Sequence, residues 1–175
     1  MNDNELYHYG ILGMKWGVRR FQNKDGSLTN DGKKRYSIGN GLTLEERKLS
    51  KFANFLGKHI KSVREEQKKS TSYDIKVGKK KVGDLDLYQE SYDSININWI
   101  GINAKERGKH YASTVMHWVV KSSAEKGMSQ LTLEVPTSSP DARHIYEKYG
   151  FKEVGKVSDN DDVWDGLTAM KLKLK

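Results

Sequence analysis

The chain has 175 residues, of which 35% are hydrophobic and 31% are charged, and its net charge is +8. This length and polarity allow one domain with a modest core, and no apolar run reaches the roughly 20 residues that a membrane-spanning helix needs. The absence of cysteine excludes disulfides, thiolate nucleophiles and cysteine-based zinc sites. The polar start of the chain predicts that there is no secretory signal.

Most of the positive charge lies in residues 41–81, which carry 12 Lys and Arg against 5 Asp and Glu. A stretch of this kind is either a solvated basic helix face or a surface that contacts nucleic acid or an acidic protein. Few aromatic residues accompany the lysines, which favours the solvated face over a nucleic-acid partner.

Three parts follow one another along the chain. Residues 1–40 are rich in glycine and turn signals, and their aromatic residues argue against a plain linker, so we expect a tail or docking segment. Residues 41–70 are predicted to form an amphipathic basic helix, spanning 43–69, with Thr43 and Glu46 as a capping box. Residues 71–175 form the third part.

The third part begins with apolar residues that alternate with polar ones, which predicts three antiparallel strands ending at Ile102. The alternation slips by one residue near Trp99–Ile102, as a β-bulge would cause. The elements expected after these strands are a helix over 110–126, a strand over 131–135, a helix over 140–149, and strands over 151–157 and 167–174.

A basic loop, Lys105-Glu106-Arg107-Gly108-Lys109-His110-Tyr111-Ala112, joins the third strand to the next helix. A glycine-containing loop between a strand and a helix is a general device for holding an anion. Its amides and the positive end of the helix dipole both face the negative charge.

The loop resembles the acetyl-CoA pyrophosphate loop of the GNAT family of N-acetyltransferases, Arg/Gln-x-x-Gly-x-Gly/Ala. The stretch ARHIYEKYGF, residues 142–151, resembles that family's second signature, and the order of elements over 71–175 agrees with the family. The resemblance implies an α+β fold in three layers, with a mixed, mostly antiparallel sheet, splayed central strands and flanking helices.

The resemblance also implies acetyl transfer from acetyl-CoA to an amine acceptor, which includes amines on proteins. It assigns the pyrophosphate to Arg107, Gly108, Lys109, His110, Tyr111, Ala112 and Ser113, and the pantetheine arm to backbone groups of Ile100 and Ile102. Tyr146 would be the acid that protonates the departing thiol. Glu134 is a candidate base, with Glu90, Asp93 or a water chain as alternatives.

One departure from the family pattern bears on activity, because the central glycine of the loop is His110 here. Its imidazole would obstruct a phosphate, point away from it or donate to it. A second departure is Ser139, where the family often has asparagine. These departures leave a rival hypothesis, in which the chain is a catalytically silent virion or interaction protein that keeps the fold.

Residues 8–36 resemble a short segment of head-associated and virion-packaged proteins of tailed phages that infect Gram-positive bacteria. The resemblance rests on sequence motifs such as Gly13-Met14-Lys15-Trp16-Gly17 and Asp25-Gly26-Ser27-Leu28-Thr29. It implies a phage or prophage origin, a phage-particle partner, and a place in the host bacterial cytoplasm or the virion. The five histidines lack metal-ligand spacing, so no metal site is predicted.

Overall fold

The computed structural model describes residues 34–157 and 166–174. The chain divides into two compact units, Met1–Tyr36 and Ser37–Lys175. Most of the predicted tail therefore lies outside the described residues, and the fold below is essentially that of the second unit. Within the described part of the chain, no helix is both long and apolar enough to span a membrane.

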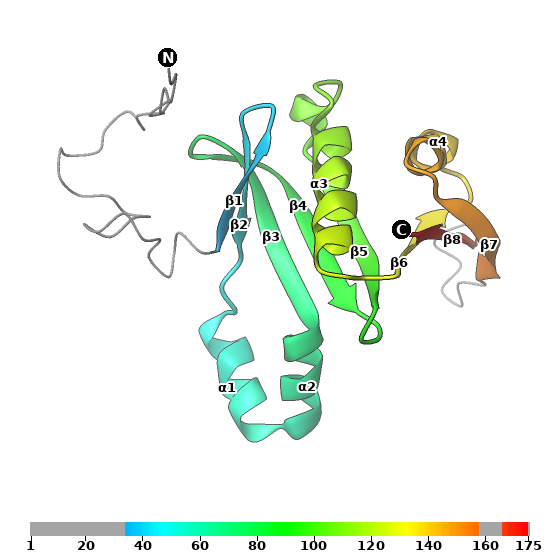
Figure 1. The fold of residues 1–175 in the computed structure, drawn as a ribbon. Helices are drawn as coiled ribbons and strands as arrows, with labels where there is room; N and C mark the ends of the chain where they lie inside the picture. The colour runs from blue at the N-terminus through cyan, green and yellow to red at the C-terminus, as the bar shows by residue number, and fades with distance from the viewer. Residues whose placement is uncertain (1–33, 158–165, 175) are drawn as a thin grey trace, which may run out of the picture. The chain divides into compact units, whose positions relative to one another are not determined.

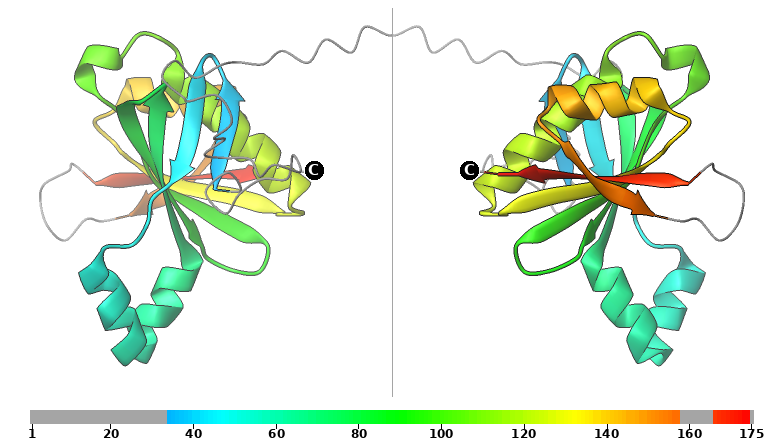
Figure 2. Two further views of the ribbon diagram at one scale, coloured as in Figure 1. Left: turned by 90° about the vertical axis from the view of Figure 1, so that its left-hand side faces the viewer. Right: turned by 90° about the vertical axis from the view of Figure 1, so that its right-hand side faces the viewer.

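An eight-stranded sheet runs through the described residues in the order β1-β2-β3-β4-β5-β6-β8-β7 (Figures 1 and 2). The strands are β1 Arg35–Gly39, β2 Leu42–Glu46, β3 Ser70–Val77, β4 Lys80–Gln89, β5 Ser94–Ile102, β6 Gln130–Pro136, β7 Lys152–Val157 and β8 Leu167–Lys173. From β2 to β7, neighbouring strands are antiparallel except for the parallel pair β5 and β6. This confirms the predicted mixed, mostly antiparallel sheet.

One face of the sheet is apolar, because alternate side chains of successive strands point to the same side. Helix α3, Tyr111–Glu125, packs its buried Val115, Met116 and Val119 into the core. Its Trp118 meets Tyr73 of β3 edge to face, with 5.7 Å between ring centroids. Each fully buried apolar side chain contributes about 1.5–3 kcal/mol, so this face holds most of the stabilising contacts. We call the opposite side of the sheet the outer face.

The stretch predicted as one helix over 43–69 is a strand followed by two helices. Leu42 and Leu44 are buried and pair with β3, so residues 42–46 are the strand β2. Helix α1, Lys51–His59, begins at Ser50, whose side chain accepts a hydrogen bond of 3.1 Å from the amide of Ala53. Ile60 is extended, with φ −118° and ψ 114°, and separates α1 from α2, Lys61–Lys69.

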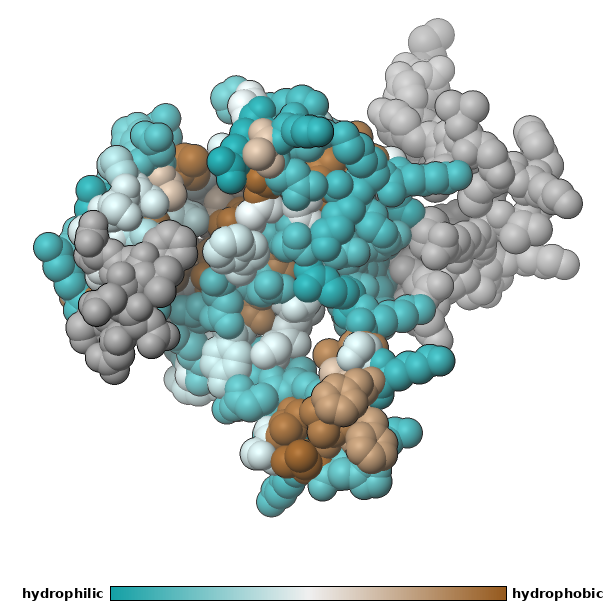
Figure 3. All heavy atoms as spheres, turned by 180° about the vertical axis from the view of Figure 1, so that it is seen from behind, coloured by the Kyte–Doolittle hydropathy of each residue, from teal (hydrophilic) through white to brown (hydrophobic). Residues whose placement is uncertain are grey.

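The two helices form a hairpin at one end of β3 (Figures 1 and 2). Gly57 is buried in it, and a Cβ at that position would clash with the side-chain amide of Gln67. Gln67 in turn donates to the carbonyl of Ala53 over 2.8 Å. Figure 3 shows a hydrophobic patch over the hairpin. The exposed large apolar side chains of the hairpin are Phe52, Phe55 and Ile60, and Leu49 is exposed just before α1.

The strands β5 and β6 diverge as they leave the centre of the sheet. They are paired only from Ser94 to Ile97 of β5, although β5 continues to Ile102 and β6 to Pro136. A bulge marks the point of divergence, because Trp99 and Ile97 face consecutive residues of β4 and Asn98 is the extra residue. The predicted splay and bulge are confirmed, with the bulge one residue earlier than the sequence indicated.

Candidate functional site

A cleft of about 650 Å³ opens between the end of β5, the following loop, the first turn of α3 and helix α4, Pro140–Lys148. The structure brings nine of the predicted site residues together around it: Ile100, Ile102, Arg107, Gly108, His110, Tyr111, Ala112, Ser113 and Tyr146. Two predicted residues, Lys109 and Glu134, are not among the side chains that line it.

The loop is fixed by a buried carboxylate that sequence reasoning did not single out. Glu106, at the end of the short helix η1 (Ala104–Glu106), is only 6% exposed. Its oxygens accept hydrogen bonds from Lys109 Nζ, over 2.7 Å, and from Lys80 Nζ. These bonds, that of Lys109 first, lower the pKa of Glu106 to about 2. The charge of Lys109 is therefore already engaged within the loop.

The first turn of α3 presents unpaired amides to the cleft. The first helical hydrogen bond runs from the Thr114 amide to the His110 carbonyl over 3.0 Å. The amides of Tyr111, Ala112 and Ser113 precede it, and so have no acceptor within the helix. Together with the helix dipole they form a site suited to an anion such as a phosphate.

His110 holds the backbone in the left-handed conformation that glycine adopts most easily, with φ 59° and ψ 19°. In the described residues the only other non-glycine residue with positive φ is Asn40. Its side chain donates to the carbonyl of Lys109 over 3.2 Å. The backbone at His110 thus has the conformation that a glycine would adopt. The hydrogen bond from Asn40, in the β1–β2 turn, stabilises the loop next to it.

Helix α4 carries Tyr146, and Tyr149 is the residue that ends the helix. Tyr146 lines it and packs edge to face on the buried Phe151, with 6.0 Å between centroids. Burial raises the pKa of Tyr146, so its hydroxyl stays protonated and can donate a proton. Tyr149, which the sequence analysis gave no role, donates from its hydroxyl to the Ser113 carbonyl over 2.6 Å. This bond ties α4 to the first turn of α3.

The three carboxylates considered as bases lie elsewhere. Glu134 is exposed on β6, opposite Ala169 of β8, and outside the cleft lining. Glu90 accepts hydrogen bonds of 2.9 Å from the hydroxyls of Ser94 and Thr132. Asp93 accepts 2.6 Å and 2.8 Å bonds from the hydroxyls of two serines, Ser129 and Ser91. Glu90 and Asp93 therefore already hold neighbouring segments together.

The arrangement combines three chemical capacities in one cleft. Unpaired amides at the start of α3 can hold an anion, and the part of β5 beyond Ile97 is not paired with β6. A protonated tyrosine stands on the opposite wall. Among residues 34–157 and 166–174, no group of three His, Asp or Glu side chains could hold a metal ion.

Comparison with known families gives two matches. Residues 42–174 match the acetyltransferase (GNAT) domain, and residues 1–23 match a family of unknown function (DUF7211). No curated protein matches the chain.

Solved structures share the fold at low sequence identity. A GNAT family acetyltransferase from Elizabethkingia anophelis, with acetyl-CoA bound, is 14% identical at a TM-score of 0.59, over 78% of this chain and 100% of that one. The spermidine N-acetyltransferase of Vibrio cholerae is 19% identical at a TM-score of 0.61, over 77% and 95%. An acetyltransferase from Bacillus subtilis in complex with CoA is 14% identical at a TM-score of 0.58, over 75% and 98%.

These likenesses agree with the predicted fold class. The family match is the stronger finding, because it spans well over half of the chain and includes every residue of the cleft. The chain therefore belongs to the GNAT family of acetyltransferases.

Proposed function

We propose that this protein is an active N-acetyltransferase that uses acetyl-CoA as donor and an amine as acceptor. The observation that carries the proposal is the convergence of the open amides of α3, the free part of β5 and Tyr146 on one cleft. The acetyl-CoA-bound relative of the same fold supports the choice of donor. No nucleophilic side chain is required, since an amine can attack a thioester directly.

The residues present fit such a donor. The amides of Tyr111, Ala112 and Ser113 would hold the pyrophosphate, assisted by the guanidinium of Arg107. Backbone groups of β5 from Ile100 to Ile102 would bind the amide-bearing pantetheine arm, as a further strand would. When bound, acetyl-CoA supplies the acetyl thioester. Gly108 and His110 shape the loop, and Lys109 supports it through Glu106.

Tyr146 is proposed as the proton donor to the departing thiol. Its raised pKa keeps the proton on the hydroxyl at neutral pH, as this role requires. A Tyr146→Phe change should lower kcat by about a hundredfold or more, with little change in acetyl-CoA affinity. If the Tyr146→Phe variant keeps the wild-type kcat, Tyr146 is not the proton donor. Glu134 stays a prediction as general base, and a water chain remains the alternative.

Titration of the folded protein with acetyl-CoA tests the proposal directly. We expect saturable binding that the Tyr146→Phe variant retains. Folded protein that shows no heat of binding at millimolar acetyl-CoA would refute the donor assignment. Turnover is then followed by release of free thiol with a panel of amines.

A catalytically silent protein is the second candidate, and His110 is the observation that favours it. Its side chain stands at the start of α3, where the family pattern has glycine. If acetyl-CoA binds only to the His110→Gly variant, the natural loop no longer accepts the donor. If the wild type binds acetyl-CoA and Tyr146→Phe lowers acetyl transfer, this rival is excluded.

We further propose a phage or prophage origin for the chain, with residues 8–36 as a particle-docking segment and the host cytoplasm or the virion as its location. The support is the amino-acid sequence of that segment, which resembles sequences found on phage head proteins. Co-purification of a tagged full-length chain with phage particles tests the docking. A chain lacking residues 8–36 that is packaged equally well would contradict it.

A further inference from the structure

The turn between β1 and β2 lies against the start of α3. A Cβ at Gly39 would come within 4.0 Å of Thr114 Cγ2. The next residue of the turn, Asn40, donates from its side chain to the carbonyl of Lys109 over 3.2 Å. Thr114 donates from its amide and from its hydroxyl to the carbonyl of His110, over 3.0 Å and 3.1 Å. The turn therefore contacts the chain on both sides of His110.

The sequence of the turn suits its backbone. The three residues of Gly39-Asn40-Gly41 all have positive φ, of 94°, 51° and 69°. Glycine adopts such a conformation readily, and asparagine does so more easily than most other residues. His110, with φ 59°, is a less suitable residue for this conformation and keeps it only where neighbouring contacts hold it. Asn40 supplies one of these contacts.

The hydrogen bond from Asn40 also sets the direction of an amide. The Lys109 carbonyl and the His110 N–H belong to the same planar trans peptide, so they point in opposite directions. Because the carbonyl faces Asn40, the His110 N–H points away from the turn. In the described part of the chain it donates to no backbone carbonyl. It is therefore a further open amide, next to the three at the start of α3.

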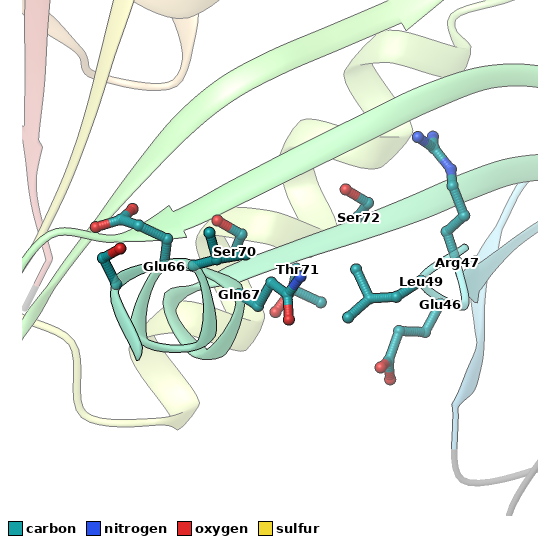
Figure 4. Close-up of a pocket in the computed structure, with 10 residues that line it drawn as sticks. Glu46, Arg47, Leu49, Glu66, Gln67, Ser70, Thr71 and Ser72 are labelled. Carbon is teal, nitrogen blue, oxygen red and sulfur yellow. The ribbon is translucent and has the colours of Figure 1, made fainter. Parts of the chain in front are cut away.

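The second pocket, of about 430 Å³, is a poor alternative site for a pyrophosphate (Figure 4). Two acidic residues, Glu46 and Glu66, line it. Arg47 lines it too, but its guanidinium already pairs with Asp74 and Asp84 on the outer face of the sheet. The loop and the first turn of α3 are therefore the better site for an anion.

We propose that Asn40 is a positioning residue for the acetyl donor, which holds the Lys109–His110 peptide so that its amide faces the pyrophosphate. Asn40 does not line the cleft and acts through the loop. The part of the chain that matches the GNAT domain begins at residue 42, so this support comes from outside it. The inference rests on the proposed function, because it assumes that the loop binds the donor.

Isothermal titration of the full chain with acetyl-CoA tests this role. Asn40→Gly removes the hydrogen bond, and glycine keeps the positive φ of the turn. The variant should bind acetyl-CoA about fivefold to tenfold more weakly than the wild type, which is the effect of losing one hydrogen bond. If both proteins bind equally well, this inference fails alone. If the wild type does not bind, the proposed function fails and takes the inference with it.

The NMR signal of the His110 amide separates positioning from a general effect on the fold. Acetyl-CoA should move this amide proton downfield in the wild type, because a charged phosphate oxygen is a strong acceptor. In Asn40→Gly the movement should be smaller even at saturating acetyl-CoA. An equal movement in both proteins would overturn the proposal. A lower unfolding temperature of the variant together with lost affinity would mean that Asn40 supports the fold, and would also overturn it.

Asn54→Ala is the matched control. Asn54 of α1 donates from its side chain to the carbonyl of Leu49 over 3.1 Å, and Leu49 lines the second pocket. The control thus removes a hydrogen bond of the same kind away from the loop, and should bind acetyl-CoA as the wild type does. A loss of affinity equal to that of Asn40→Gly would show that the effect is not specific to the loop, and would refute the assignment.

Discussion

At the scale of single residues, His110 combines a strained backbone with a position at the mouth of the cleft. A side chain at φ 59° is disfavoured because its Cβ crowds the backbone, which costs of order 1 kcal/mol. We expect His110→Gly to raise the free energy of unfolding by about 1 kcal/mol in urea titrations. The matched variant Asn40→Gly should raise the free energy of unfolding by less. Asparagine tolerates this backbone conformation, and the Asn40 side chain also donates a hydrogen bond to the loop. A less stable His110→Gly protein would show instead that the imidazole stabilises the loop.

Glu106 makes the stability of the folded protein depend on pH, and the direction of this dependence follows from its pKa. Its pKa falls from an ordinary 4.5 to about 2 in the folded protein, chiefly through the hydrogen bond from Lys109. Well above pH 4.5 the carboxylate is ionised in both folded and unfolded chains, and its bonds stabilise the fold in full. As pH falls from about 4.5 towards 2, the unfolded chain binds the proton first and this stability is lost.

The stability advantage of the wild type over Glu106→Gln should therefore be constant above pH 5 and shrink towards pH 2. Urea unfolding of both proteins across this range measures it. The advantage of the wild type over Glu125→Gln, whose carboxylate is exposed, should stay small throughout. A Glu106→Gln difference that does not change with pH would contradict the role assigned to the two lysines.

The site residues that could be predicted stand in short sequence motifs, whereas those that could not make contacts with residues far away in the sequence. Arg107, Gly108 and Tyr146 stand in short motifs, so their neighbours in the sequence identify them. Tyr149 instead donates to the carbonyl of Ser113, 36 residues earlier in the chain. Such contacts join positions far apart in the chain, and no local pattern encodes which strands pair or in which register.

At the scale of elements, the strands and helices after residue 70 could be predicted because their periods extend over several residues. The stretch 42–46 carries conflicting signals, since Thr43 and Glu46 match a capping box while Leu42 and Leu44 match a strand. The pairing of β2 with β3 decides between them, because it buries both leucines. Gly57 of α1 leaves room for the side chain of Gln67 of α2, which a Cβ at that position would meet.

The attachment of α4 to α3 is a second feature at this scale. The hydrogen bond from the Tyr149 hydroxyl to the Ser113 carbonyl joins the two walls of the cleft. Tyr149→Phe should lower the free energy of unfolding by about 1 kcal/mol and also weaken acetyl-CoA binding. Tyr92→Phe, at a tyrosine that is 87% exposed, is the matched control and should change neither. Unchanged acetyl-CoA affinity in Tyr149→Phe would show that the cleft does not need this link.

At the scale of the whole molecule, part of the positive charge of the basic stretch 41–81 is already paired with carboxylates. The basic residues of 41–81 that pair with carboxylates in the described part of the chain are Arg47, Lys68, Lys76, Lys80 and Lys81. A phosphate backbone would have to compete with these intramolecular partners. This agrees with the solvated basic surface that the shortage of aromatic residues favours.

We therefore expect no measurable binding of an about 20-base-pair DNA duplex at about 150 mM salt, and a shallow salt dependence of any binding seen below it. Fluorescence anisotropy between about 50 and 200 mM salt measures both. Lys79→Glu reverses a charge in the β3–β4 turn that is not in an ion pair among the described residues, and so reports on free positive charge at the surface. Affinity that falls steeply with salt and is lost in Lys79→Glu would show a true nucleic-acid surface, because each phosphate contact adds nearly one counterion to the slope.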